Sequence, residues 1–163
     1  MTAARTAARL ACTIALFAAA PLAASAADHQ VMLKNQGADG STMVFEPAFV
    51  SVQPGDTVHF IPTDPGHNVE TIPGMLPTGA TALKGDPSKP YDVTFTTPGL
   101  YGVRCRPHFA MGMVGMIVVG GPPANLDQAK AVTVPGMAKA RMDALLAKAA
   151  AVKPAAKSKK HHA

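Results

Sequence analysis

The segment that most constrains this chain is a nine-residue stretch containing one cysteine, one histidine and two methionines. It contains Cys105, His108, Met111 and Met113, and a strand-like run lies on either side of it. A second histidine, His67, follows a glycine in an upstream turn. Thiolate and thioether ligands suit Cu(I), and imidazole also accepts Cu(II). Two histidines, one cysteine and one weakly bound methionine therefore predict a blue-copper site built across two loops.

The N-terminus has the pattern of an export signal. Two arginines within the first nine residues precede an uncharged, alanine-rich stretch at residues 10–22, and Ala24-Ser25-Ala26 is a small-residue cleavage pattern. The apolar stretch is shorter than the ~20 residues that a membrane-spanning helix needs. We therefore expect residues 1–26 to be a signal peptide cleaved near Ala26 or Ala27, and the mature protein to lie in the periplasm.

Removal of this signal, which contains Cys12, leaves Cys105 as the only cysteine. A single cysteine in an exported chain has no internal disulfide partner, so a bound metal is the economical explanation for its thiol. The mature chain has 13 lysines and arginines (15 minus the two in the signal) against 10 aspartates and glutamates. No basic stripe interleaved with aromatic residues accompanies this small excess, which argues against a nucleic-acid partner.

The body of the chain alternates short strand-like runs with turns rich in glycine and proline. The expected strands lie at residues 31–34, 43–45, 49–52, 57–61, 91–96, 100–105 and 114–119. Seven short strands at this spacing predict a mainly β domain, an antiparallel Greek-key β-sandwich whose end loops carry the site.

Beyond the last expected strand the sequence pattern changes to that of helices. We expect two C-terminal helices packed on the sandwich, one at residues 125–131 capped by Asn125 and one at residues 137–152. The domain then covers residues 27–152. Residues 153–163 have the composition of a disordered basic tail.

Several motifs together resemble the cupredoxin family, and within it the pseudoazurins. They are Pro54-Gly55-Asp56-Thr57-Val58, Gly66-His67-Asn68, Gly99-Leu100-Tyr101 and Cys105-x2-His108-x4-Met113. Plastocyanins share the ligand spacing but usually end at the strand after the methionine, whereas this chain continues into two helices. The resemblance covers roughly residues 29–147, and it implies a monomeric electron carrier and not an enzyme.

The same resemblance implies a ligand set. His67, Cys105, His108 and Met113 would bind one type 1 copper that cycles between Cu(II) and Cu(I). The family pattern also implies that the backbone N–H of Asn68 donates to the Cys105 sulfur, while its side chain ties the two ligand loops together. Met111 is the alternative axial ligand, but the four-residue gap of the family favours Met113.

Other kinds of site fit the sequence less well. A structural zinc site normally has four strong ligands, and only three are present. A Cys-His hydrolase would need an oxyanion-donor motif, and none stands out. A second, catalytic copper would need further histidines, and the remaining ones (His29, His59, His161 and His162) are scattered. A storage or delivery protein for copper is the serious alternative, with His161 and His162 as an exchange site.

The resemblance also implies redox-protein partners, with copper nitrite reductase as the acceptor and cytochromes as further partners. They would dock on an apolar patch around His108, formed by Pro107, Phe109, Ala110, Met111 and Gly112 and extended by Met75, Leu76 and Pro77. A basic rim of Arg104 and Arg106, with Lys34 and Lys84 as weaker members, would attract an acidic partner.

Overall fold

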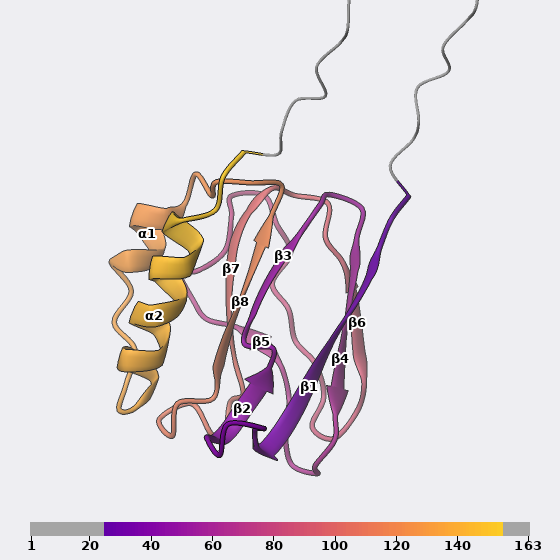
Figure 1. Cartoon of the computed structure of the whole chain (residues 1–163), viewed down its shortest axis with the longest axis vertical. Coiled ribbons are helices and arrows are strands. Elements are labelled where there is room, and N and C mark those ends of the chain that lie inside the picture. Colours follow the sequence, from indigo (N-terminus) through magenta and orange to yellow (C-terminus); the bar gives the residue numbers. More distant parts are fainter. Residues whose placement is uncertain (1–24, 155–163) are drawn as a thin grey trace, which may run out of the picture.

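The computed structural model describes residues 25–154, so most of the predicted signal peptide and of the predicted basic tail lie outside the described residues. Two four-stranded sheets face each other (Figure 1). The first has the order β2-β1-β4-β6 and consists of β1 (Asp28–Gln36), β2 (Thr42–Glu46), β4 (Thr57–Pro62) and β6 (Tyr91–Thr94). The second has the order β3-β8-β7-β5 and consists of β3 (Phe49–Val52), β5 (Glu70–Thr71), β7 (Gly99–Arg104) and β8 (Val114–Val119).

Two helices, α1 (Leu126–Lys130) and α2 (Ala138–Ala150), cover the outer face of the second sheet (Figure 1). The predicted β-sandwich with two C-terminal helices is therefore confirmed. All seven expected strands are present, and both helices lie within their expected ranges. Within residues 25–154, no helix has the length and hydropathy needed to cross a membrane.

The expectation of a purely antiparallel sandwich was wrong. β1 pairs with β4 in parallel, and β3 pairs with β8 in parallel. The reason is that β2 and β3 belong to different sheets, so the chain crosses the sandwich before β4 enters the first sheet beside β1. The short strand β5 was not predicted, because two residues within a loop-rich segment carry no periodicity. It pairs with the end of β7 and thereby positions the upstream ligand loop next to the downstream one.

Strand β8 is buried at all six positions because both of its faces are covered. Ile117 and Val119 belong to the core between the two sheets. Val114, Met116 and Val118 belong to a second core between the sheet and the helices. This explains why the sequence of β8 is continuously apolar and does not alternate. The ligand loop enters β8 directly, so it is anchored to the most buried strand of the fold.

Asn125 does not cap α1 as predicted. It occupies the N-cap position, but its side chain forms no cap hydrogen bond. Its Nδ2 group instead donates to the carbonyl of Leu100 (2.9 Å), and its Oδ1 accepts the N–H of Leu100 (2.8 Å). The asparagine therefore forms its hydrogen bonds with the backbone at the start of β7 and not with the helix, and it joins α1 to the second sheet.

Asp56 ties the first described residues to the turn between β3 and β4. The residue is only 6% exposed, and its carboxylate accepts the N–H groups of Ala27 (2.9 Å) and Gln53 (2.8 Å). His29 Nε2 lies 3.2 Å from its second oxygen. These hydrogen bonds, with the two backbone donors as the main cause, lower the pKa of Asp56 below its ordinary value. The ionised carboxylate is therefore part of the native structure.

The Asp56 contacts predict an acid-sensitive stability. Because the native pKa is lowered, the carboxylate stabilises the fold above about pH 4, and this contribution is lost as the pH falls through the native pKa. Asp56→Asn should reduce the free energy of unfolding at pH 7 by about 1–3 kcal/mol and flatten its decline below about pH 4. Denaturant titrations between about pH 2 and pH 7 measure both effects.

A matched control is Asp86→Asn, which removes an exposed carboxylate that pairs with Lys89. Exposed ion pairs contribute about 0–1 kcal/mol, so this variant should follow the wild-type pH profile. The assigned role of Asp56 would be contradicted if the free energy of unfolding of Asp56→Asn declined with falling pH as steeply as that of the wild type.

Candidate metal centre

The predicted metal-binding side chains converge from two loops. His67 lies on the loop after β4, and Cys105 and His108 lie on the loop between β7 and β8. The Nδ1 atoms of His67 and His108 are 3.1 Å apart. The Cys105 sulfur lies 3.7 Å from Nδ1 of His67 and 3.5 Å from Nδ1 of His108. Among residues 25–154, this is the only group of three or more Cys, His, Asp or Glu side chains arranged to hold a metal.

The orientation of the His67 ring is set by a residue that sequence reasoning missed. The Nε2–H of His67 donates to Oδ1 of Asn35 at the end of β1 (3.0 Å). This leaves the lone pair on Nδ1, which faces the other donors. Gly66 adopts a φ of +89° at the preceding turn, and its N–H donates to the Ser88 hydroxyl (2.8 Å). The loop therefore fixes both the position and the tautomer of this histidine.

His67 is fully buried, and burial is the main cause of its lowered pKa, with the neighbouring His108 contributing. A lowered pKa keeps the imidazole neutral, which is the form that binds metals. At Cys105 burial acts in the other direction and raises the pKa of the thiol. A metal must displace the thiol proton on binding, so loading of this site releases a proton.

Asn68 links the two ligand loops as the family pattern implied. Its backbone N–H donates to the Cys105 sulfur (3.5 Å), and its Oδ1 accepts the N–H of Arg106 (2.8 Å). Its Nδ2 donates to the carbonyl of Gly85 (3.3 Å). Pro107 has no N–H, so it cannot supply a second donor to the sulfur. The predicted hydrogen bonds of Asn68 are thus confirmed.

The two candidate methionines differ sharply in exposure. Met113 is fully buried, and its carbonyl accepts the N–H of Cys105 (3.0 Å). The side chain of Met111 is 45% exposed. A thioether ligand must reach a buried sulfur and two imidazoles, so this difference supports Met113 as the axial ligand. The assignment remains a prediction.

The donor set fits a copper ion. Two donors at about 2.0 and 2.3 Å from one ion and roughly 120° apart lie roughly 3.7 Å from each other, which is close to the sulfur–nitrogen distances of 3.7 and 3.5 Å. The two Nδ1 atoms, 3.1 Å apart, lie somewhat closer together. Two imidazoles, one thiolate and a weak thioether suit an ion that alternates between Cu(II) and Cu(I). Within residues 25–154, four strong ligands of the kind that a structural zinc site needs are not brought together.

Other histidines of the described chain are engaged elsewhere. His29 contacts Asp56, and His59 lies between Asp28 (3.3 Å) and Asp92 (2.9 Å). The two aspartates raise the pKa of His59. His161 and His162 lie outside the described residues. His29 and His59 are thus held by carboxylates of the first sheet and its turns.

The predicted basic rim needs correction at Arg104. Its guanidinium pairs with Glu70 (3.0 Å) and lies over the Phe109 ring, 4.9 Å from the centroid. The pairing follows from the β5–β7 register, which places Glu70 opposite Arg104, a contact that the sequence spacing did not reveal. Lys34 likewise pairs with Glu46. Of the four proposed rim residues, Arg106 and Lys84 remain as exposed cations near the site.

The predicted apolar patch is also smaller than expected. Pro107, Ala110 and Met111 are exposed, whereas Phe109 is half-buried and Gly112 is buried. Of the proposed extension, Met75 and Pro77 are buried and only Leu76 is half-exposed. Met75 fills the space beside Gly102, where an added Cβ would lie 2.5 Å from the methionine sulfur.

The two-sheet sandwich and the buried Cys-His-His cluster define a single-copper cupredoxin. Residues 31–120 match the family described as copper binding proteins, plastocyanin/azurin family. The pseudoazurin of Paracoccus pantotrophus is 51% identical over 139 residues, which cover 83% of this chain and 95% of that protein. The pseudoazurin of Methylorubrum extorquens is 44% identical over 137 residues, covering 84% of this chain and 92% of that protein.

The crystal structure of native pseudoazurin from Hyphomicrobium denitrificans shares the fold, with a TM-score of 0.71 and 45% identity. The match covers 74% of this chain and 97% of that one. The chain belongs to the pseudoazurin family. It is therefore a type 1 copper electron-transfer protein, of a family of carriers that act with redox proteins and are not enzymes.

Proposed function

We propose that this protein is a monomeric periplasmic carrier that delivers single electrons to a copper nitrite reductase, with cytochromes among its other partners. Its copper would be held by His67, Cys105, His108 and Met113. The observation that supports this proposal best is the difference in burial among these four residues. His67, Cys105 and Met113 are fully buried, whereas His108 is only half-buried.

The unequal burial indicates a route for the electron. A bound copper ion would supply the redox change, and the half-buried imidazole of His108 would be the ligand nearest the surface. Pro107 and Met111 on either side of it present apolar surface to a partner. A short apolar contact of this kind allows fast dissociation, which a shuttle needs.

The protein also restricts rearrangement around the ion. The hydrogen bonds between His67 and Asn35 and between Asn68 and Cys105 hold ligands from both loops in place. A preorganised site of this kind changes little between oxidation states, and that favours electron transfer over metal exchange. A delivery protein would instead need an open, mobile site.

Redox cycling distinguishes the two functions. We expect bound copper to remain at one ion per chain through repeated reduction and re-oxidation, and the reduced protein to be re-oxidised by nitrite in the presence of a copper nitrite reductase. Stopped-flow absorption and metal analysis after each cycle measure both properties. Removal of residues 153–163 should leave the electron-transfer rate unchanged.

The delivery alternative predicts the opposite result. Reduced protein would then transfer Cu(I) rapidly to an apo-protein acceptor, and the transfer would depend on His161 and His162. No re-oxidation by the reductase and nitrite would contradict the proposed acceptor while leaving the carrier function intact. The periplasmic location is tested by the N-terminal sequence of the secreted form, with cleavage expected near Ala26.

A further inference from the structure

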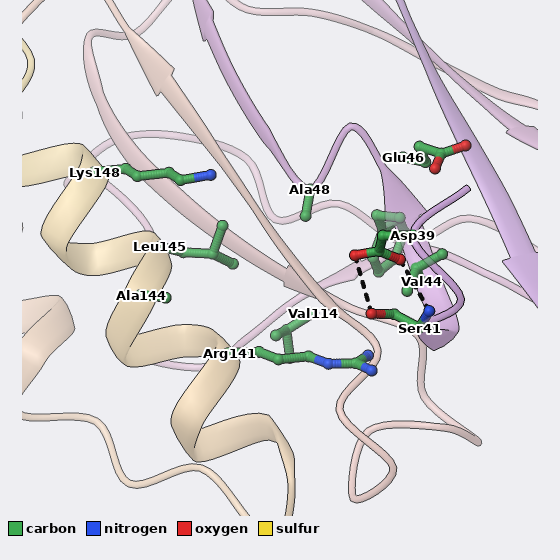
Figure 2. Close-up of a pocket in the computed structure, with 11 residues that line it drawn as sticks. Asp39, Ser41, Val44, Glu46, Ala48, Val114, Arg141, Ala144, Leu145 and Lys148 are labelled. Atoms are coloured by element: carbon green, nitrogen blue, oxygen red, sulfur yellow. Dashed lines mark hydrogen bonds between the residues drawn. The ribbon is translucent and has the colours of Figure 1, made fainter. Parts of the chain in front are cut away.

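Arg141 connects α2 to the start of β2 and to the ligand loop between β7 and β8. Its Nη1 group donates to the carbonyls of Met43 and Gly112, both at 2.9 Å. Its Nη2 group donates to the carbonyl of Thr42 (3.0 Å). Figure 2 shows the side chain reaching from α2 across a groove of about 370 Å³ toward the β1–β2 connection. One guanidinium therefore binds three main-chain carbonyls, two of them on adjacent residues of β2 and the third on the distant ligand loop.

The first contact acts on the backbone of the proposed axial ligand. The Gly112 carbonyl also accepts the N–H of Val114 (2.9 Å), a bond that closes a three-residue turn around Met113. The N–H of Met113 donates to the carbonyl of His108 (3.2 Å). An added Cβ at Gly112 would lie 3.1–3.2 Å from Arg141 atoms, so the arginine packs directly over this glycine. Arg141 thus supports the turn from which the Met113 thioether extends.

The second contact acts on β2, which pairs with the strand that carries Asn35. Met43 has a φ of +52°, an uncommon backbone conformation for a residue with a side chain. The pairs on either side of it in the β1–β2 register place Met43 opposite Asn35. Asn35 is the residue that accepts the hydrogen bond from His67. By holding the Met43 carbonyl, Arg141 also supports the strand pair that orients His67.

The start of α2 also contacts the ligand loop between β7 and β8, the loop that contains Gly112. The N–H of Met137 donates to the carbonyl of Ala110 (3.0 Å). Gly136 approaches that carbonyl so closely that an added Cβ would lie 2.4 Å from its oxygen. The helix is therefore seated on the loop, and Arg141, one turn further on, is held at a fixed distance from Gly112.

We propose that Arg141 is a positioning residue of the copper centre, which holds the axial-ligand turn and the His67-orienting strand pair in one arrangement. This inference rests on the proposed ligand set. The guanidinium serves this role through geometry, because its planar fork binds several acceptors at once, whereas a lysine ammonium is a point charge. Within residues 25–154, no carboxylate lies at ion-pair distance from Arg141, so its donors are used on the backbone.

The test compares Arg141→Lys, which keeps the charge, with Arg141→Gln, which removes it. In both variants we expect copper affinity to fall on the order of 10–100-fold, as is typical when a support of a metal ligand is lost. The reduction potential should shift in the same direction in both. The metal-free variants should show faster amide hydrogen exchange at Met113 and Val114 than the metal-free wild type. Competition with a chelator, redox titration and NMR measure these three quantities.

The matched control is Lys148→Gln, which removes an exposed charge from the same helix and the same groove. It should match the wild type in affinity, potential and exchange. If Arg141→Lys also matches the wild type, charge alone is sufficient and the positioning role is wrong. Equal acceleration of exchange throughout both sheets would show a general loss of stability and would also overturn the inference.

Failure of the proposed copper-binding function would give a different experimental result. Wild-type protein that forms no intensely coloured Cu(II) complex would disprove the ligand set, and this inference with it. A coloured wild type with unchanged Arg141 variants would disprove the role of Arg141 alone.

Discussion

Cys105→Ser should abolish the intense visible absorption of the Cu(II) protein and lower copper affinity by more than about 100-fold. The absorption arises from charge transfer between the thiolate and Cu(II), and a serine hydroxyl supplies neither the sulfur nor a stable anion near neutral pH. The effect should exceed the roughly 10–100-fold loss that accompanies removal of a supporting hydrogen bond. Visible and electron paramagnetic resonance spectra, with a chelator competition, measure it.

The methionine variants complete this test. Met111→Leu should leave the spectrum almost unchanged, because its side chain is 45% exposed. Met113→Leu should keep the colour but shift the spectrum and the reduction potential, because the axial ligand tunes both. The reverse pattern would assign Met111 as the axial ligand. A coloured Cys105→Ser protein would disprove the ligand set altogether.

Met111→Asp should slow electron transfer to a partner by about tenfold or more while leaving the copper spectrum unchanged. The side chain lies in the exposed apolar surface beside His108, and a carboxylate there must be desolvated when a partner docks. A loss of about 1.4 kcal/mol at a central contact corresponds to tenfold. Stopped-flow measurements at high salt isolate this apolar contribution, because long-range steering is then screened.

Thr96→Asp is the matched control, since it adds the same charge at the exposed turn before β7, at the end of the strand opposite Cys105. It should leave the high-salt rate unchanged. Equal slowing by both variants would indicate that net charge, and not the patch around His108, controls the reaction.

The basic rim can be tested with the residues that remain exposed. Arg106→Glu should slow association with an acidic partner at low salt, and this difference should diminish as the ionic strength rises. Arg104→Glu is unsuitable, because it would also break the Glu70 pair and place two carboxylates together. An Arg106→Glu protein with an unchanged salt response would indicate docking through apolar surface alone.

The sequence by itself determined the positions of seven of the eight strands, the types of side chain in the candidate site and most of the family assignment. These features are local, because strand periodicity, turn residues and the Cys105-x2-His108-x4-Met113 spacing are written within short segments. The hydrogen bonds of Asn68 were also predictable, but through the family resemblance and not from spacing.

Only the tertiary structure decided which distant residues support the site. Asn35 meets His67, Glu70 neutralises Arg104, and Arg141 reaches Gly112, in each case across a long sequence separation. These contacts depend on strand register and on where α2 packs, and a register shift of one residue would redirect every side chain of a strand. The sequence thus specifies the groups that can bind copper, while the fold determines how firmly they are held and which neighbouring charges remain free.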